Sequence, residues 1–89
     1  METTVITFEI TSNFCDWSKA YDESIPLQKE FGLVSMFRGN NKNEPSKCVV
    51  IVSAEPGQLD KFMEANSDMV EASGHVLEST VLTLSLIHI

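Results

Sequence analysis

Disulfide partners and metal ligands are scarce in this chain, whose 89 residues include two cysteines and two histidines. Cys15 and Cys48 lack a C-x-x-C spacing, so they predict neither a disulfide framework nor a zinc site. Both lie beside apolar residues, and we expect them to be small buried side chains in a reducing compartment, the cytoplasm. We expect no metal ion and no cofactor.

Basic residues are also few. Six Lys and Arg stand against thirteen Asp and Glu, which gives a net charge of −7. Because phosphate groups are bound by clustered Lys and Arg, we expect no nucleic-acid partner and no anionic-membrane partner. The acidity is typical of a surface that keeps a small protein in solution.

Long hydrophobic runs are missing, since none approaches the roughly 20 residues of a membrane span. Met1 is followed directly by Glu2 and a strand-like pattern, without the basic and apolar segments of a signal peptide. These two features predict a cytoplasmic protein that does not enter a membrane.

The clearest pattern in the chain is a β-α-β unit in its second half. An unbroken apolar run from Cys48 to Ala54 predicts a buried strand. Pro56–Ser73 has the apolar periodicity of one amphipathic helix, and Gly74 is a typical residue to end it. The alternating run His75–Leu84 predicts the next strand.

The first half of the chain predicts the same elements in the same order. Thr3–Thr11 alternates as a strand does, with one apolar face, and Ser12-Asn13 is a helix N-cap. Pro26 predicts a break or a kink in the following helix at Ser24-Ile25. Leu33–Arg38 predicts a strand, followed by a hairpin loop. The apolar face of the first strand and the stripe along the helix comprise Ile6, Phe8, Ile10, Phe14, Trp17 and Tyr21.

The order β-α-β-β-α-β favours an α+β, ferredoxin-like fold. We expect one domain over residues 1–83, with a four-stranded antiparallel sheet and both helices on one face. The opposite face would then expose Val5, Val81 and part of the two middle strands. An apolar patch of this kind predicts a homodimer through the open sheet face, and the alternative is a solvated face of mixed polarity.

The last six residues, LSLIHI (84–89), break the pattern because no polar residue ends the strand. They resemble the translation of a transposon mosaic-end sequence used in DNA library preparation. We therefore expect residues 84–89 to be non-native sequencing-adaptor read-through, outside the domain.

Three segments carry a resemblance to a known family: FGLVSMFRG (residues 31–39), FMEAN (62–66) and ASGH (72–75). With the order of elements, they resemble a small uncharacterised family, a domain of unknown function seen in marine bacteria. The resemblance implies membership of the dimeric α/β-barrel superfamily. That superfamily includes cofactor-independent monooxygenases, haem-degrading enzymes, isomerases and binding modules, so the resemblance implies an architecture rather than an activity.

His75 is the one candidate catalytic residue. It follows Gly74 at the junction of helix and strand, and an imidazole can act as a general base near neutral pH. The alternative is a capping or surface histidine that bonds to the last carbonyls of the helix. Otherwise the catalytic residues are unknown from the sequence.

An aromatic set could line a ligand pocket. Trp17 and Tyr21 share one helical face, while Phe37 and Arg38 end the second predicted strand, and His75 would close the set. Such a pocket, with one cation, would suit an aromatic or carboxylated ligand. The alternative is that the aromatic stripe is simply part of the core.

Three functions are compatible with these features. The first is a non-catalytic, homodimeric protein that binds a small apolar ligand or assists another protein. The second is a cofactor-independent monooxygenase or isomerase with His75 as base. The third is a module that binds a different protein through the bare sheet face. The absence of a P-loop, a dinucleotide fingerprint or a Ser-His-Asp order favours the first.

Overall fold

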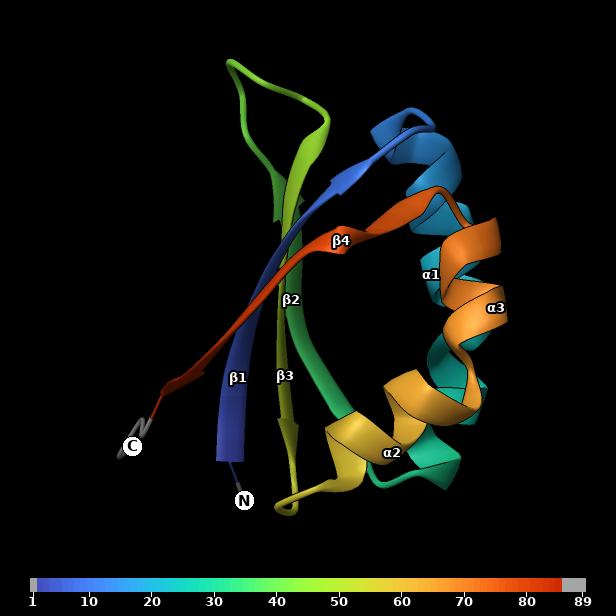
Figure 1. Ribbon diagram of the computed structural model, residues 1–89, viewed down its shortest axis with the longest axis vertical. Helices are drawn as coiled ribbons and strands as arrows, with labels where there is room; N and C mark the ends of the chain where they lie inside the picture. Colours follow the sequence, from blue (N-terminus) through green and yellow to red (C-terminus); the bar gives the residue numbers. More distant parts are fainter. Residues whose placement is uncertain (1, 86–89) are drawn as a thin grey trace.

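The computed structural model describes residues 2–85, with side chains as far as residue 83. One antiparallel sheet, in the order β2-β3-β1-β4, carries all helices on one of its faces (Figure 1). This arrangement confirms the predicted ferredoxin-like α+β fold. The elements are β1 (Glu2–Ile10), α1 (Phe14–Glu30), β2 (Val34–Asn40), β3 (Lys47–Ala54), α2 (Gln58–Ala65), α3 (Ser67–Ala72) and β4 (His75–Ser85).

The core lies between the sheet and the helices. β1 and β3 pair without a break from Glu2↔Ala54 to Glu9↔Lys47, so their alternate side chains face the helices in matching rows. This confirms the predicted parity of β1, because period-2 alternation places every second side chain on one face. The buried apolar side chains are Ile6, Phe8, Ile10, Trp17, Leu33, Cys48, Val50, Val52, Ala54 and Phe62.

Helix α1 runs unbroken through Pro26, so a break at Ser24-Ile25 is wrong, while a kink there stays a prediction. It begins as predicted at Asn13, whose side-chain oxygen accepts a hydrogen bond from the amide of Asp16 at 2.8 Å. A proline in a helix removes one backbone hydrogen bond. Just before Pro26, the hydroxyl of Ser24 donates to the carbonyl of Tyr21 at 2.6 Å, and the packing of α1 on the sheet outweighs the local penalty.

The second predicted helix is two helices, α2 and α3, which meet at Asn66. Asn66 has φ −123° and ψ 22°, outside the helical region, and its side-chain amide donates to the carbonyl of Phe62 at 3.1 Å. Asparagine bonds readily to nearby backbone and so competes with helix propagation. Gly74 follows with φ 100°, and a Cβ there would lie 2.5 Å from the hydroxyl oxygen of Ser12.

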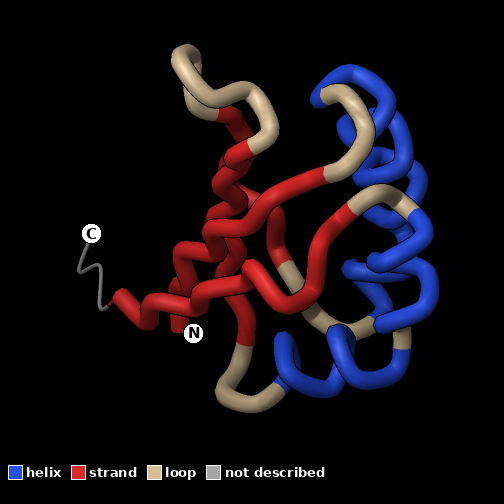
Figure 2. The backbone as a smooth tube through the Cα atoms, turned by 45° about the horizontal axis from the view of Figure 1, so that its top comes forward, coloured by secondary structure: helices blue, strands red, loops and turns tan. Residues whose placement is uncertain are grey.

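Strand β4 contains a wide bulge that regular alternation did not predict. Val76 pairs with Glu9 and Val81 pairs with Thr7, so residues 77–80 lie opposite one residue of β1. The amide of Glu9 donates to the hydroxyl of Ser79 at 2.7 Å within this bulge. As a result β4 bends as it leaves the helical layer (Figure 2). Residues of β4 that regular alternation would place on one face therefore lie on opposite faces before and after the bulge.

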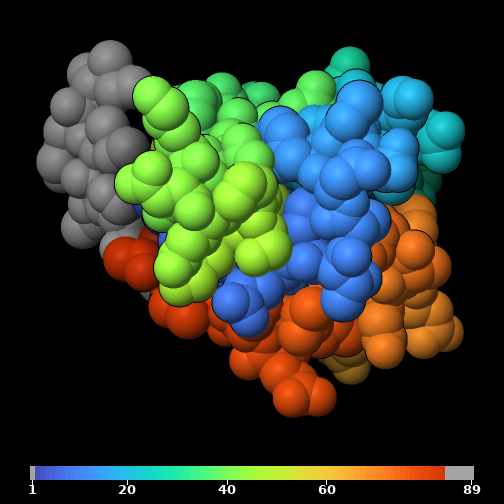
Figure 3. All heavy atoms as spheres, turned by 90° about the horizontal axis from the view of Figure 1, so that it is seen from above, coloured from blue at the N-terminus to red at the C-terminus, as the bar shows by residue number. Residues whose placement is uncertain are grey.

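The β2–β3 loop lies at one end of the molecule, the end that faces the viewer in Figure 3. The amide of Ile10 donates to the carbonyl of Ser46 at 2.9 Å, which ties this loop to the end of β1. Nearby, Cys48 is buried, and burial raises the pKa of its thiol. Cys15 is exposed on α1, so its predicted burial is wrong: its position is turned away from the stripe that faces the sheet.

The sheet face opposite the helices carries several exposed apolar side chains. Val34, Met36 and Phe37 on β2 are each about half exposed, as is Val81 on β4. Val5 and Ile51, which pair across β1 and β3, lie between them and are partly buried. We refer to these six residues as the open-face patch. A homodimer through this patch stays a prediction.

Two further predictions concern the ends of the chain and the membrane. The backbone of Leu84 and Ser85 continues β4 beside β1, and residues 86–89 lie outside the described residues. A foreign origin of residues 84–89 therefore stays a prediction. Within residues 2–85, no helix has the length and apolar character needed to cross a membrane.

Candidate functional site

A cavity of about 420 Å³ lies between the helices and the helix-facing side of the sheet. Its wall is mainly apolar, with contributions from β1, β3 and all three helices. Cavities of this size, apolar with a few polar groups, are typical of small-molecule sites. The residues that line it include Phe8, Trp17, Tyr21, Gln28, Phe62 and His75.

An aromatic ladder forms one side of this cavity. Trp17 is 3% exposed, and its ring centroid lies 5.3 Å from that of Phe8 and 5.1 Å from that of Tyr21. The helical spacing of Trp17 and Tyr21 places both on the buried side of α1, because residues four apart share a face. The predicted aromatic stripe is therefore both core and cavity wall.

His75 is buried in the same wall rather than at the surface. Its ring stacks on Phe8 with a centroid distance of 4.0 Å and an interplanar angle of 6°. The bulge in β4 brings the hydroxyl of Thr80 within 2.6 Å of the Nε2 atom of His75. Burial lowers the pKa of His75 to about 4, so the imidazole is neutral at pH 7 and is a weak base.

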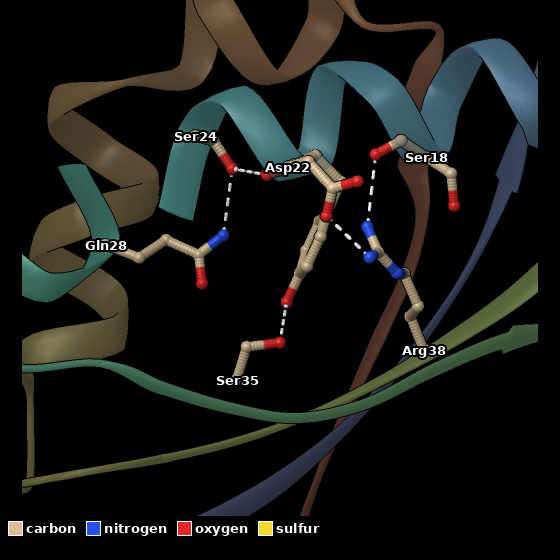
Figure 4. A network of polar contacts seen from close by, with 7 residues as sticks. Ser18, Asp22, Ser24, Gln28, Ser35 and Arg38 are labelled. Atoms are coloured by element: carbon tan, nitrogen blue, oxygen red, sulfur yellow. Dashed lines mark hydrogen bonds and ion pairs between the residues drawn. The ribbon is translucent and has the colours of Figure 1, made fainter. Parts of the chain in front are cut away.

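Tyr21 contacts two residues of β2, Ser35 and Arg38, which are labelled in Figure 4. Its hydroxyl bonds to the hydroxyl of Ser35, and the guanidinium of Arg38 lies 5.1 Å from its ring centroid. Arg38 also pairs with Asp22 and donates to the carbonyl of Ser18 at 3.1 Å. The Arg38 cation is therefore engaged on the rim of α1, and Arg38 is not among the residues that line the cavity.

Phe37 lies on the other side of the sheet. β2 pairs with β3 through Ser35↔Val52 and then Phe37↔Ile51, so Met36 is an extra residue in a bulge. The bulge turns Phe37 onto the open face, where it is 53% exposed. The structure thus brings together Trp17, Tyr21 and His75 of the predicted set, but not Phe37, and it leaves Arg38 outside the cavity.

Gln28 is the residue of the site that the sequence analysis missed. It is 4% exposed, and its side-chain amide donates to the hydroxyl of Ser24 at 2.9 Å (Figure 4). Its Oε1 atom is buried and has no hydrogen-bond partner among the described residues. The signal was present: Gln28 continues the helical stripe of Trp17, Tyr21 and Ser24, which the expected break at Pro26 cut short.

The cavity has little charge. Its lining within the described residues contains no Lys or Arg, and its one carboxylate, on Glu23, belongs to an exposed residue. The described residues also form no group of three or more His, Cys, Asp or Glu that could hold a metal ion. The site can enclose a neutral molecule, stack an aromatic ring and offer a few polar atoms.

This geometry defines a class: ferredoxin-like α+β proteins with an apolar cavity between the helices and the sheet. The chain belongs to the family described as a domain of unknown function, DUF3764, which matches residues 1–86. No curated protein and no solved structure gives a significant match.

Proposed function

We propose that this protein is a non-catalytic module that binds a small, mainly apolar ligand in the cavity between its helices and its sheet. The observation that carries the proposal is the cavity of about 420 Å³ with its aromatic wall. The cavity is partly open to solvent. Removing apolar surface from water is favourable, so an apolar ligand that covers this wall would gain free energy from the contact.

We also propose that the protein is a cytoplasmic homodimer formed through the open-face patch. Half-exposed side chains such as Phe37 and Val81 support this proposal, since clustered exposed apolar groups mark interfaces. A two-fold axis would place the same patch on both copies. The free thiols of Cys15 and Cys48 are consistent with a reducing compartment.

A cofactor-independent monooxygenase or isomerase is the second candidate function, because His75 lines the cavity where a substrate would lie. The lowered pKa of His75, about 4, argues against it, since a general base works best with a pKa near the working pH. Binding without catalysis therefore accounts for the site better.

The proposal is tested with N-phenyl-1-naphthylamine, a neutral probe whose fluorescence rises in apolar surroundings. Trp17 is the one tryptophan of the chain and lies in the cavity wall, so energy transfer from Trp17 reports binding at this site. We expect saturable energy transfer with one probe per chain.

Two variants locate the probe. Ala20 lines the cavity, and Ala20→Phe should fill part of it and weaken probe binding at least about tenfold. Ala65 is exposed on α2, so Ala65→Phe is the matched control and should leave binding unchanged. Equal binding by both variants would contradict the proposed site.

A further inference from the structure

We infer that the cavity selects neutral ligands that carry a hydrogen-bond donor, and that Oε1 of Gln28 accepts this bond. The inference rests on the proposed binding function and specifies its ligand class. It starts from the buried amide of Gln28 on α1, whose Oε1 atom has no partner among residues 2–85.

The hydrogen bonds around Ser24 fix the orientation of the Gln28 amide. The hydroxyl of Ser24 has one proton, which it donates to the carbonyl of Tyr21 at 2.6 Å. Toward Gln28 the Ser24 oxygen can therefore only accept. The atom 2.9 Å away must be the NH₂ group of Gln28, which leaves Oε1 as the atom without a partner.

A buried acceptor without a donor is rare in folded proteins, because it has lost its hydrogen bonds to water and gained none in return. In Figure 4 the Oε1 atom points away from Ser24 toward the sheet, and Gln28 is one of the residues that line the cavity. The terminal torsion of a glutamine side chain is broad, so a rotation about it would present Oε1 to a ligand in the cavity. A hydroxyl or N–H group of a ligand would complete the missing bond.

The charges of the site restrict the ligand further. Arg38 is paired with Asp22 outside the cavity, and His75 is buried and stacked on Phe8. A carboxylate ligand would therefore lose its hydration without meeting a cation, and Glu23 at the edge would repel it. A neutral alcohol or phenol, or a neutral compound with an N–H group, fits both the acceptor and the wall if the rest of the molecule is apolar.

Three probes with the same ring system test the inference by isothermal titration calorimetry at pH 7. They are 2-naphthol, a neutral donor; 2-methoxynaphthalene, in which the donor is capped; and 2-naphthoate, an anion. On the wild-type chain we expect 2-naphthol to bind about tenfold more tightly than 2-methoxynaphthalene. We expect 2-naphthoate to bind most weakly.

The variant Gln28→Met removes the acceptor and keeps the length of the side chain. It should abolish the preference for 2-naphthol, so that 2-naphthol and 2-methoxynaphthalene bind with about equal affinity, because both probes then meet the same apolar wall. Gln58→Met is the matched control, since Gln58 begins α2 and does not line the cavity. It should keep the wild-type preference.

Failure of the inference and failure of the proposed function give different results. If wild-type protein binds both neutral probes equally, the role of Gln28 is overturned while the cavity remains a binding site. This comparison needs no variant and so does not depend on how Gln28→Met folds. If none of the three probes binds, the proposed function fails and the inference falls with it.

Discussion

The two faces of the sheet carry similar apolar side chains but differ in what covers them. Phe8 on the helix-facing side is 5% exposed, whereas Phe37 on the open face is 53% exposed. Alternation along β3 buries Val50 and Val52 beneath the helices. The residues between and beside them, which face the other way, are less covered. Helices of the same chain cover most of one face of the sheet. The other face is apolar and has no covering layer within the chain.

This difference separates two tasks within one small sheet. The helix-covered face encloses the aromatic wall, His75 and Gln28 around a cavity, which is where a small molecule would bind. The open-face patch carries half-exposed apolar side chains from β2 and β4, which would suit a second copy of the chain. A domain this small buries a modest share of its surface, so both additions would stabilise it.

The largest expected contrast is between phenylalanines on the two faces. Phe8→Ala should lower the free energy of unfolding by about 3 to 5 kcal/mol, because it empties a packed position and removes the stack on His75. Phe37→Ala, the matched change on the open face, should cost less than about 1 kcal/mol at protein concentrations where the chain is monomeric. Urea unfolding followed by Trp17 fluorescence measures both. Equal costs would contradict the contrast between the faces.

The burial of His75 should appear as a pH dependence of stability. The pKa of His75 is about 4 in the folded chain, below its ordinary value of 6.5, so the unfolded chain takes up a proton first as the pH falls. Stability is unaffected by this group above pH 6.5 and declines between pH 6.5 and 4. The loss should be on the order of 2 to 3 kcal/mol.

The variant His75→Gln isolates this contribution, because it keeps every carboxylate of the chain. The difference in unfolding free energy between wild type and variant should change across the stated range and be constant at higher pH. Parallel pH profiles for the two proteins would show that His75 is protonated as easily in the folded state as in the unfolded one.

A charge on the open face should weaken the proposed dimer. Val81 is 57% exposed and pairs with Thr7 on that face, so Val81→Lys would place two like charges in a two-fold interface. We expect the dissociation constant of the dimer to rise at least about tenfold, which corresponds to roughly 1.4 kcal/mol of binding free energy. Sedimentation equilibrium measures this constant.

The neighbouring residue provides the control for this charge. Leu82 pairs with Ile6, on the helix-facing side, and is 46% exposed, so Leu82→Lys should leave the dimer intact. A wild-type chain that sediments as a monomer would remove the dimer from the account and favour a different protein as the partner of the open-face patch.

The smallest effect is expected at the exposed ion pair between α1 and β2. Asp22→Asn removes the ion pair with Arg38, but the Asp22 side chain is 59% exposed. Exposed ion pairs contribute about 0 to 1 kcal/mol, so thermal unfolding should shift by no more than a few degrees. A loss comparable to that of Phe8→Ala would show that the Arg38 contacts, rather than the buried rings, hold α1 on the sheet.

The regular parts of the fold could be predicted from the sequence. Period-2 alternation predicted the buried face of β1, and Asn13 and Gly74 marked where helices begin and end. These signals are local: each depends on residues that lie next to one another in the chain. The order of the elements then left the ferredoxin-like arrangement as the simplest topology.

The parts that were missed depend on contacts between distant residues. The bulge at Met36 turns Phe37 to the open face, and pairing with β3 sets that register. Packing on the sheet keeps α1 continuous through Pro26 and so brings Gln28 into the cavity. No local pattern indicates the bulge at Met36. The helical spacing of Gln28 did indicate its face of α1, but the local rule for proline was given more weight, and propensity is a weak guide where tertiary packing decides.

Native mass spectrometry of the full chain, purified from cells under mild conditions, shows directly whether a ligand occupies the cavity between the helices and the sheet. We predict protein ions that carry the extra mass of one small neutral molecule per chain. The variant Ala20→Phe, with part of the cavity filled, should lack this mass, while Ala65→Phe should keep it. Wild-type chains without added mass, or added mass that Ala20→Phe retains, would contradict a ligand site between the helices and the sheet.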